Sequence, residues 1–127
     1  MKRIRNLIPL AIKATETHLL VDKENKTVAK EMNGYISSFG ASIISSGLLP
    51  TIIFYSQKGK SEGDRTDFID ALAYMCKEKQ YIKNDENLTT KIKDDFDQKA
   101  EMSRLKNFII DASVALKLAI RTFSKSK

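Results

Sequence analysis

The sequence predicts an all-α protein, a single compact bundle of five or six helices with a short apolar helix at its centre. Along most of the chain, apolar residues recur at alternating steps of three and four, which is the period of a buried helix face. No run of alternating β-branched residues indicates a strand, and two prolines and five glycines in 127 residues argue against a many-turned β fold. At this length we expect one domain over residues 1–127.

The first two predicted helices cover residues 6–23 and 27–45, with a polar turn around residues 22–26 between them. In the second helix the apolar residues alternate steps of four and three. Another line of this helix consists of small residues, Gly34, Ser38, Ala41 and Ser45. Small side chains let another backbone come close, so we expect a second helix on this line, with a phosphate backbone as the alternative.

The short central helix is the most informative element, and it lies within residues 46–59. Ser46 or Gly47 can cap its start, Pro50 is tolerated in the first turn, and Gly59 supplies a stop. A helix so short and so apolar is stable only when other helices surround it. We therefore predict that the hub of the bundle is formed by Leu49, Ile52, Ile53 and Phe54.

Three further segments complete the predicted fold. A loop over residues 59–64 leads to a fourth helix, which Asp64 or Thr66 caps. After a polar hinge at residues 83–87, a short helix over residues 89–99 has only Ile92 and Phe96 as anchors. The last helix, residues 100–124, is the clearest element, because its apolar residues keep the helical spacing over five turns.

The charge is unevenly distributed along the chain. The net charge is +6, and residues 61–99 carry seven Lys or Arg against ten acidic residues, whereas residues 100–127 carry six against two. Such a distribution predicts two faces of opposite sign, a basic face for a polyanion and an acidic face for a protein neighbour. The alternative is that the charges serve solubility alone.

The basic residues of the last helix form a candidate RNA-binding ridge. Lys99, Lys106, Lys117 and Arg121 fall within about 60° of one another around a helix axis, clear of the apolar stripe. Lys125 joins them if the helix extends that far, and Lys13 joins if the two ends of the chain pack together. Contact with a phosphate backbone is the expected role, and a solvated helix face is the alternative. Tyr35, Tyr55 and Tyr81 are available for base stacking, but none lies in an RNA-binding motif.

Catalytic and metal-binding chemistry is not indicated. His18 and Cys76 are the only residues of their types, and each fits a packed position better than a nucleophile–base pair. The acidic residues Asp94, Asp95 and Asp97 point in different directions on a helix and predict a solvated face, not a metal site. Gly59-Lys60-Ser61 lacks the strand and the first glycine of a P-loop. We predict no enzymatic activity and no cofactor.

The single cysteine suggests a reducing compartment, because no disulfide within the chain is possible. No apolar stretch reaches the length of a membrane span, and the apolar run after the N-terminal cations is too short for a signal peptide. These features predict a cytoplasmic protein without membrane contact.

Three stretches together resemble the small subunit of the Cmr complex, the type III-B CRISPR RNA-guided effector. They are RIRNLIPLAIK at residues 3–13, SGLLPTIIFYSQK at 46–58, and residues 100–123 with LKNF at 105–108. The resemblance implies a non-catalytic helical bundle that packs in several copies along the complex. It also implies contacts with other effector subunits and with the guide–target RNA, in support of antiviral defence.

Two other hypotheses remain open at this point. One is a free-standing helical adaptor that binds a protein partner and no RNA. The other is a small enzyme that uses His18 or Cys76.

Overall fold

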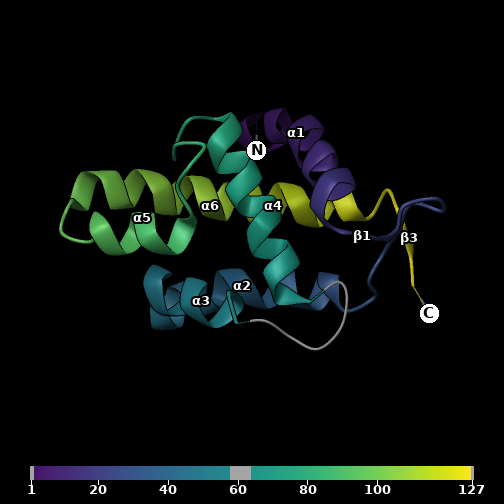
Figure 1. The fold of residues 1–127 in the computed structure, drawn as a ribbon, viewed down its shortest axis with the longest axis horizontal. Coiled ribbons are helices and arrows are strands. Elements are labelled where there is room, and N and C mark those ends of the chain that lie inside the picture. Colours follow the sequence, from purple (N-terminus) through teal and green to yellow (C-terminus); the bar gives the residue numbers. More distant parts are fainter. Residues whose placement is uncertain (1, 58–63, 127) are drawn as a thin grey trace.

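The computed structural model describes residues 2–57 and 64–126. These residues form six helices and one small sheet (Figure 1). The elements in chain order are α1 (Lys2–His18), β1 (Leu20–Asp22), β2 (Thr27–Val28), α2 (Met32–Ser46), α3 (Leu48–Tyr55), α4 (Arg65–Glu78), α5 (Leu88–Asp94), α6 (Lys99–Ile120) and β3 (Ser124–Lys125). The all-α class is confirmed, and the sheet is an addition that the sequence did not predict.

Helix α6 is the axis of the bundle. It runs across the middle of Figure 1 and packs against α1, α2 and α4, with α4 crossing in front of it. Its buried side chains follow the predicted apolar stripe, from Leu105 and Phe108 to Ala119 and Ile120. The helix begins one residue earlier than predicted and ends four residues earlier, at Ile120.

The junction of α2 and α3 depends on Gly47. This residue ends α2 through its N–H, which donates to the Ile43 carbonyl at 2.9 Å, and it is also the N-cap of α3. Its φ of 94° and ψ of 167° lie in a region that side-chain-bearing residues rarely adopt. The prediction that Ser46 or Gly47 caps the short helix is thus confirmed at Gly47, and the chain turns sharply there.

The predicted hub in α3 is wrong for two of its four residues. Ile52 is fully buried, but Ile53 is 46% exposed and Phe54 is 50% exposed. The reason is that α3 contacts α2, α4 and α5 from one side, so its other side meets solvent. A short, mostly apolar helix does not need to be surrounded when one face provides enough burial.

An aromatic cluster anchors α3 in place of that hub. The Phe39 ring lies edge-on to Tyr55 and to Phe68, with ring centroids 5.2 and 4.9 Å apart. The Tyr55 hydroxyl donates to the Tyr35 carbonyl at 2.7 Å, which satisfies the polar end of this buried side chain. The cluster joins one side chain each from α2, α3 and α4.

The helix boundaries around residues 19–31 were predicted wrongly. The first helix ends at His18, and residues 20–28 form a hairpin of β1 and β2, to which β3 adds in parallel. In the turn, the Asp22 carboxylate accepts hydrogen bonds from the Asn25 backbone N–H at 3.1 Å and its side-chain amide at 2.8 Å. This local turn chemistry, together with pairing to the distant C-terminal strand, outweighs the helical pattern.

Side-chain caps define the starts of α4 and α5. The Asp64 carboxylate accepts from the Thr66 backbone N–H at 2.9 Å, as predicted, and the Asn87 side chain accepts from the Thr90 N–H at 2.8 Å. Helix α5 ends at Asp94, five residues before the predicted end. Ile92 anchors it as predicted, but Phe96 is 61% exposed and does not. Apart from Asp64, the loop predicted at residues 59–64 lies outside the described residues.

Candidate nucleic-acid interface

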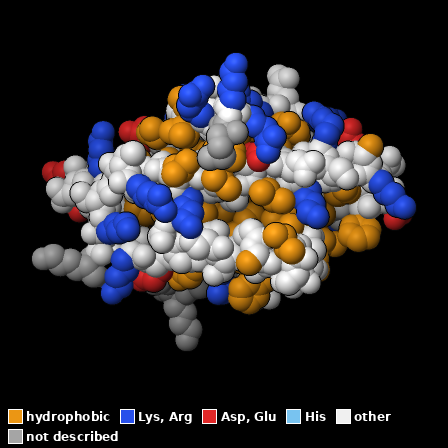
Figure 2. Space-filling model, turned by 180° about the vertical axis from the view of Figure 1, so that it is seen from behind, with side chains coloured by type: hydrophobic (Ala, Val, Ile, Leu, Met, Phe, Trp, Pro, Cys, Tyr) orange, Lys and Arg blue, Asp and Glu red, His pale blue; other side chains and the backbone are white. Residues whose placement is uncertain are grey.

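The four predicted ridge residues lie on the outward side of α6. Lys99 and Lys106 are exposed, Lys117 is half-buried, and Arg121 is exposed at the C-cap of the helix. Figure 2 shows the molecule from the side opposite to α4, and Lys and Arg side chains are spread across that face. Within residues 2–57 and 64–126, none of the four forms an ion pair. Their charges therefore remain available to an external anion.

The two accessory candidates lie elsewhere. Lys13 is exposed on α1. The side of α1 that packs against α6 and α4 is a different one, and its buried residues near Lys13 are Ala11, Ala14 and Thr15. Helix α1 packs along α6, so the two ends of the chain pack together, which is the condition under which Lys13 was expected to join the ridge. Lys125 belongs to β3, because α6 ends before it, so the condition under which it would extend the ridge is not met.

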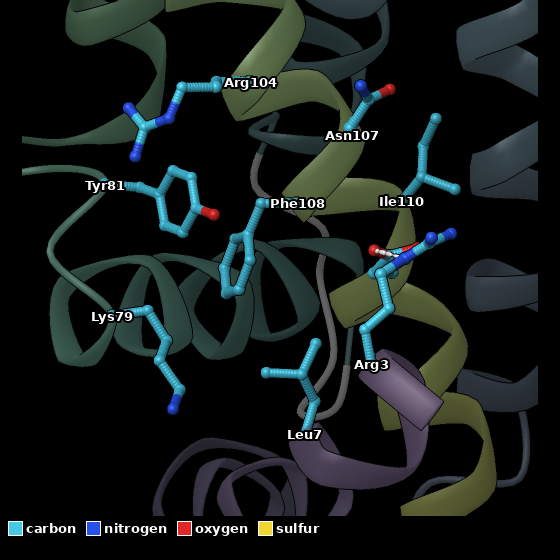
Figure 3. A pocket seen from close by; sticks show the side chains of 9 residues that line it. Arg3, Leu7, Lys79, Tyr81, Arg104, Asn107, Phe108 and Ile110 are labelled. Carbon is cyan, nitrogen blue, oxygen red and sulfur yellow. Dashed lines mark hydrogen bonds and ion pairs between the residues drawn. The ribbon is translucent and has the colours of Figure 1, made fainter. Parts of the chain in front are cut away.

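A second cationic feature is the Tyr81 hollow, a surface depression of about 780 Å³ between α1, the segment after α4, and α6. Figure 3 shows Tyr81 between Arg104 and Phe108. The Tyr81 and Phe108 rings are stacked, with centroids 4.2 Å apart and planes 17° apart. The Arg104 guanidinium carbon lies 4.8 Å from the Tyr81 centroid. Phe108 therefore stacks on Tyr81, and the Arg104 guanidinium lies over the Tyr81 ring at the surface.

Cations outnumber anions in the Tyr81 hollow. Arg3, Lys79 and Arg104 line it, against the single carboxylate of Asp111. Arg3 donates to both oxygens of that carboxylate, through Nε at 2.6 Å and Nη2 at 3.4 Å. The hydrogen bond to Asp111 raises the pKa of Arg3 further above its usual value. Asp111 balances the charge of Arg3, so the positive charges of Lys79 and Arg104 remain in excess in the hollow.

Sequence reasoning missed this hollow, although it considered Tyr81 for stacking. The one local signal is the placement of Tyr81 between Lys79 and Lys83. Arg104 and Arg3 come from other helices, so only the packing of α1 and α6 reveals them. The same expectation is wrong for Tyr55, whose ring is buried and whose hydroxyl is bound to a carbonyl.

An apolar groove adjoins the ridge. It lies between the α2–α3 junction, α5 and the start of α6, and its apolar lining includes Leu48, Leu49, Phe96 and Met102. Lys99 and Lys106 of the ridge also line it. The small-residue line of α2 is exposed, so among residues 2–57 and 64–126 no helix of this chain covers it, contrary to the favoured expectation. Ile44 on the same helix is 83% exposed.

The two residues considered for catalysis occupy packed positions. Cys76 is fully buried in α4, and burial raises the pKa of its thiol to about 12, so the thiolate is not formed at neutral pH. The His18 ring packs edge-on to Tyr74, with centroids 5.6 Å apart. No hydrogen bond joins His18 to Cys76 in the part of the chain that the structure describes.

The acidic residues at and after the end of α5 do not converge on one point. Asp95 pairs with Lys91 at 2.6 Å, and this hydrogen bond raises the pKa of the lysine. Asp94 and Asp97 are exposed, as the prediction of a solvated face requires. Over residues 2–57 and 64–126, no group of three or more His, Cys, Asp or Glu side chains has an arrangement that could hold a metal ion.

Among the described helices, none combines the length and apolar character needed to cross a membrane. Residues 11–117 match the model of a protein family described as CRISPR-associated protein (Cas_Cmr5). No curated protein and no solved structure matches the chain. The matched region begins within α1, ends within α6, and includes every ridge residue except Arg121.

Proposed function

The chain belongs to the Cas_Cmr5 family of CRISPR-associated proteins, as its resemblance to the type III-B small subunit predicted, and from this we propose its function. It is a non-catalytic small subunit of a Cmr effector complex in the cytoplasm. There it supports crRNA-guided binding of target RNA and assembly of the complex in antiviral defence. The family match over residues 11–117 is the observation that carries the proposal.

The RNA contact is assigned to the ridge of α6. Lys99, Lys106, Lys117 and Arg121 would bind phosphates of the guide–target RNA, with Lys13 as a separate contact on α1. Exposure and the absence of ion pairs within the described residues support this role. Ridge positions seven and eleven residues apart lie about 10 and 16 Å apart along a helix, a spacing that can follow a phosphate backbone.

The protein contacts are assigned to the exposed apolar side chains, of which Phe96 lines the groove beside the ridge. Four large apolar side chains on α2, α3 and the α5–α6 connection are half-exposed or exposed, and such side chains are typical of surfaces that bind other proteins. They are Ile44, Ile53, Phe54 and Phe96. Other effector subunits and further copies of this chain are the proposed neighbours. The same surface is what favours the second candidate, a free-standing adaptor that binds a protein and no RNA.

Co-purification separates the two candidates. The chain should be expressed with the effector genes that accompany it and isolated through a tag on another subunit. The proposal predicts a particle in which native mass spectrometry detects this chain together with the guide RNA. Isolation of the particle without this chain, while the chain recovers a different protein partner, would favour the adaptor.

A further inference from the structure

We infer that the Tyr81 hollow binds an unpaired nucleotide of a single-stranded RNA segment. The inference rests on the proposed function for its ligand class but uses a surface distinct from the ridge. On the helical wheel Arg104 lies about 160° from Lys106, so one RNA phosphate cannot contact both side chains closely. The residues that would form the site are Arg3, Lys79, Tyr81, Arg104, Asn107 and Phe108.

The stack supplies a platform for a base. Phe108 is almost fully buried and supports Tyr81 from beneath, at 4.2 Å between centroids. The Arg104 guanidinium carbon lies 4.8 Å from the Tyr81 centroid, and its side chain is 63% exposed, so solvent and ligands can reach the guanidinium. Guanidinium and aromatic planes are the groups on which proteins stack unpaired bases. The Arg104 plane can therefore extend the stack by one base.

The surrounding charges suit the phosphates of the same strand. Lys79 and Arg3 lie on opposite sides of the hollow in Figure 3. Lys79 forms no ion pair within the described residues, and Arg104 has only a loose contact with Glu101, at 3.9 Å. A second depression, which shares Tyr81 and Arg104 with the first, is lined by Lys77, Lys83 and Lys91 and by the carboxylates of Glu86 and Glu101, so cations are in excess there too. A strand that crosses the stack would thus meet cations on both sides.

This local arrangement overrides the charge of the whole segment. Residues 61–99 carry a net negative charge, which predicted that the segment repels RNA. However, its cations Lys77, Lys79 and Lys83 line the two depressions at Tyr81, where Glu86 is the one described acidic residue of the segment in either lining, whereas Asp94 at the end of α5 and Asp97 after it line neither. Electrostatic attraction acts over about 8–10 Å at physiological salt, so the nearby charges decide. An acidic peptide would use the same cations but has no need of the stacked rings.

The test measures binding of the full-length chain to two labelled 20-nucleotide RNA probes by fluorescence anisotropy. One probe is an unstructured single strand, and the other has the same phosphates but abasic sugars in its central half. Arg104→Lys keeps the charge and removes the planar guanidinium, whereas Lys79→Gln removes a charge away from the stack. Lys93→Gln, an exposed cation on α5 that lines neither depression, is the matched control.

The expected result separates stacking from charge. Arg104→Lys should weaken binding of the base-containing strand about fivefold or more and leave the abasic strand unaffected. Lys79→Gln should weaken both strands and reduce the slope of log K against log salt by about 0.7. Lys93→Gln should match the wild type. If Arg104→Lys and Lys79→Gln both bind like the wild type, the inference is overturned.

A ridge variant in the same assay distinguishes this failure from failure of the proposed function. If substitution of the ridge by Gln weakens binding while the two hollow variants do not, the ridge stands and the hollow falls. If the hollow variants weaken binding and the ridge variant does not, the hollow stands. If Arg104→Lys instead reduces incorporation of the chain into the effector particle with RNA binding intact, the hollow is a protein contact and the inference is wrong.

Discussion

At the residue scale, the stability of α3 depends on which side chain points inward. Ile52 and Ile53 are adjacent residues of the same type, yet Ile52 is fully buried and Ile53 is 46% exposed. Ile52→Ala should lower the free energy of unfolding by about 2–5 kcal/mol, because it leaves a cavity in the core. Ile53→Ala, the matched control, should cost less than about 1 kcal/mol. Urea denaturation measures both, and equal losses would contradict the one-sided packing of α3.

Cys76 gives a pH-dependent prediction. Burial raises the pKa of its thiol to about 12 in the folded state, above the value of about 8.5 in an unfolded chain. As the pH rises, the unfolded chain therefore loses this proton before the folded chain does. The contribution of the protonated thiol to the free energy of unfolding is complete below about pH 8.5 and falls as the pH rises toward 12. The slope is at most about 1.4 kcal/mol per pH unit.

Cys76→Ala provides the comparison for that prediction. The difference in unfolding free energy between the wild type and Cys76→Ala should shrink between about pH 8.5 and 11, since alanine has no proton to lose. A constant difference over this interval would mean that the thiol is not buried as described. In the assembled complex, His18→Ala and Cys76→Ala should leave target cleavage unchanged at normal assembly, and a specific loss of cleavage would support the enzyme hypothesis.

At the scale of elements, the α2–α3 junction requires a glycine. Gly47 has a φ of 94°, and a side chain there is strained, so Gly47→Ala should destabilise the protein by about 1–3 kcal/mol. Gly40 lies within α2, and a Cβ at that position meets nothing within 4 Å. Gly40→Ala should therefore stabilise the protein by about 0.5–1 kcal/mol. In thermal unfolding, the melting temperature should fall for Gly47→Ala and rise for Gly40→Ala. A shift of both melting temperatures in the same direction would contradict the prediction.

The elements that the sequence predicted well are those with local signals. The cap at Asp64 and the apolar stripe of α6 follow from neighbouring residues and from a regular period. The sheet could not be predicted in this way, because β2 pairs with β3 near the other end of the chain. Two- and three-residue strands also leave no period to detect. Helix ends were misplaced where a turn, such as that at Asp22, competed with the helical pattern.

At the scale of the whole molecule, the acidic residues near α5 are proposed to meet the basic end of a neighbouring subunit. Asp94 and Asp97 are exposed, whereas Asp95 is paired within the chain to Lys91. Substitution of Asp94 and Asp97 by Lys should therefore lower the number of small subunits per effector particle, and Asp95→Asn is the control. Native mass spectrometry gives that number, and an unchanged number would argue against the acidic contact.

The candidate site was only partly predictable, because some of its residues come from distant parts of the sequence. A helical wheel identifies which cations share one face of α6, and the structure gives those side chains an outward position. The Tyr81 hollow brings together Arg3, Tyr81 and Arg104, which are far apart in the sequence. Segment charge was also misleading, because it averages over side chains that point in different directions.

The central claim is that the ridge of α6 binds the RNA backbone inside the effector complex. It is tested by replacing Lys99, Lys106, Lys117 and Arg121 with Gln and titrating target RNA into the assembled complex at several salt concentrations. Each lost phosphate contact should reduce the slope of log K against log salt by about 0.7 for single strands, and somewhat more for a duplex. Affinity should fall about equally for all target sequences, because phosphates carry no base identity. An unaltered slope at normal assembly would show that the ridge faces solvent and would contradict the claim.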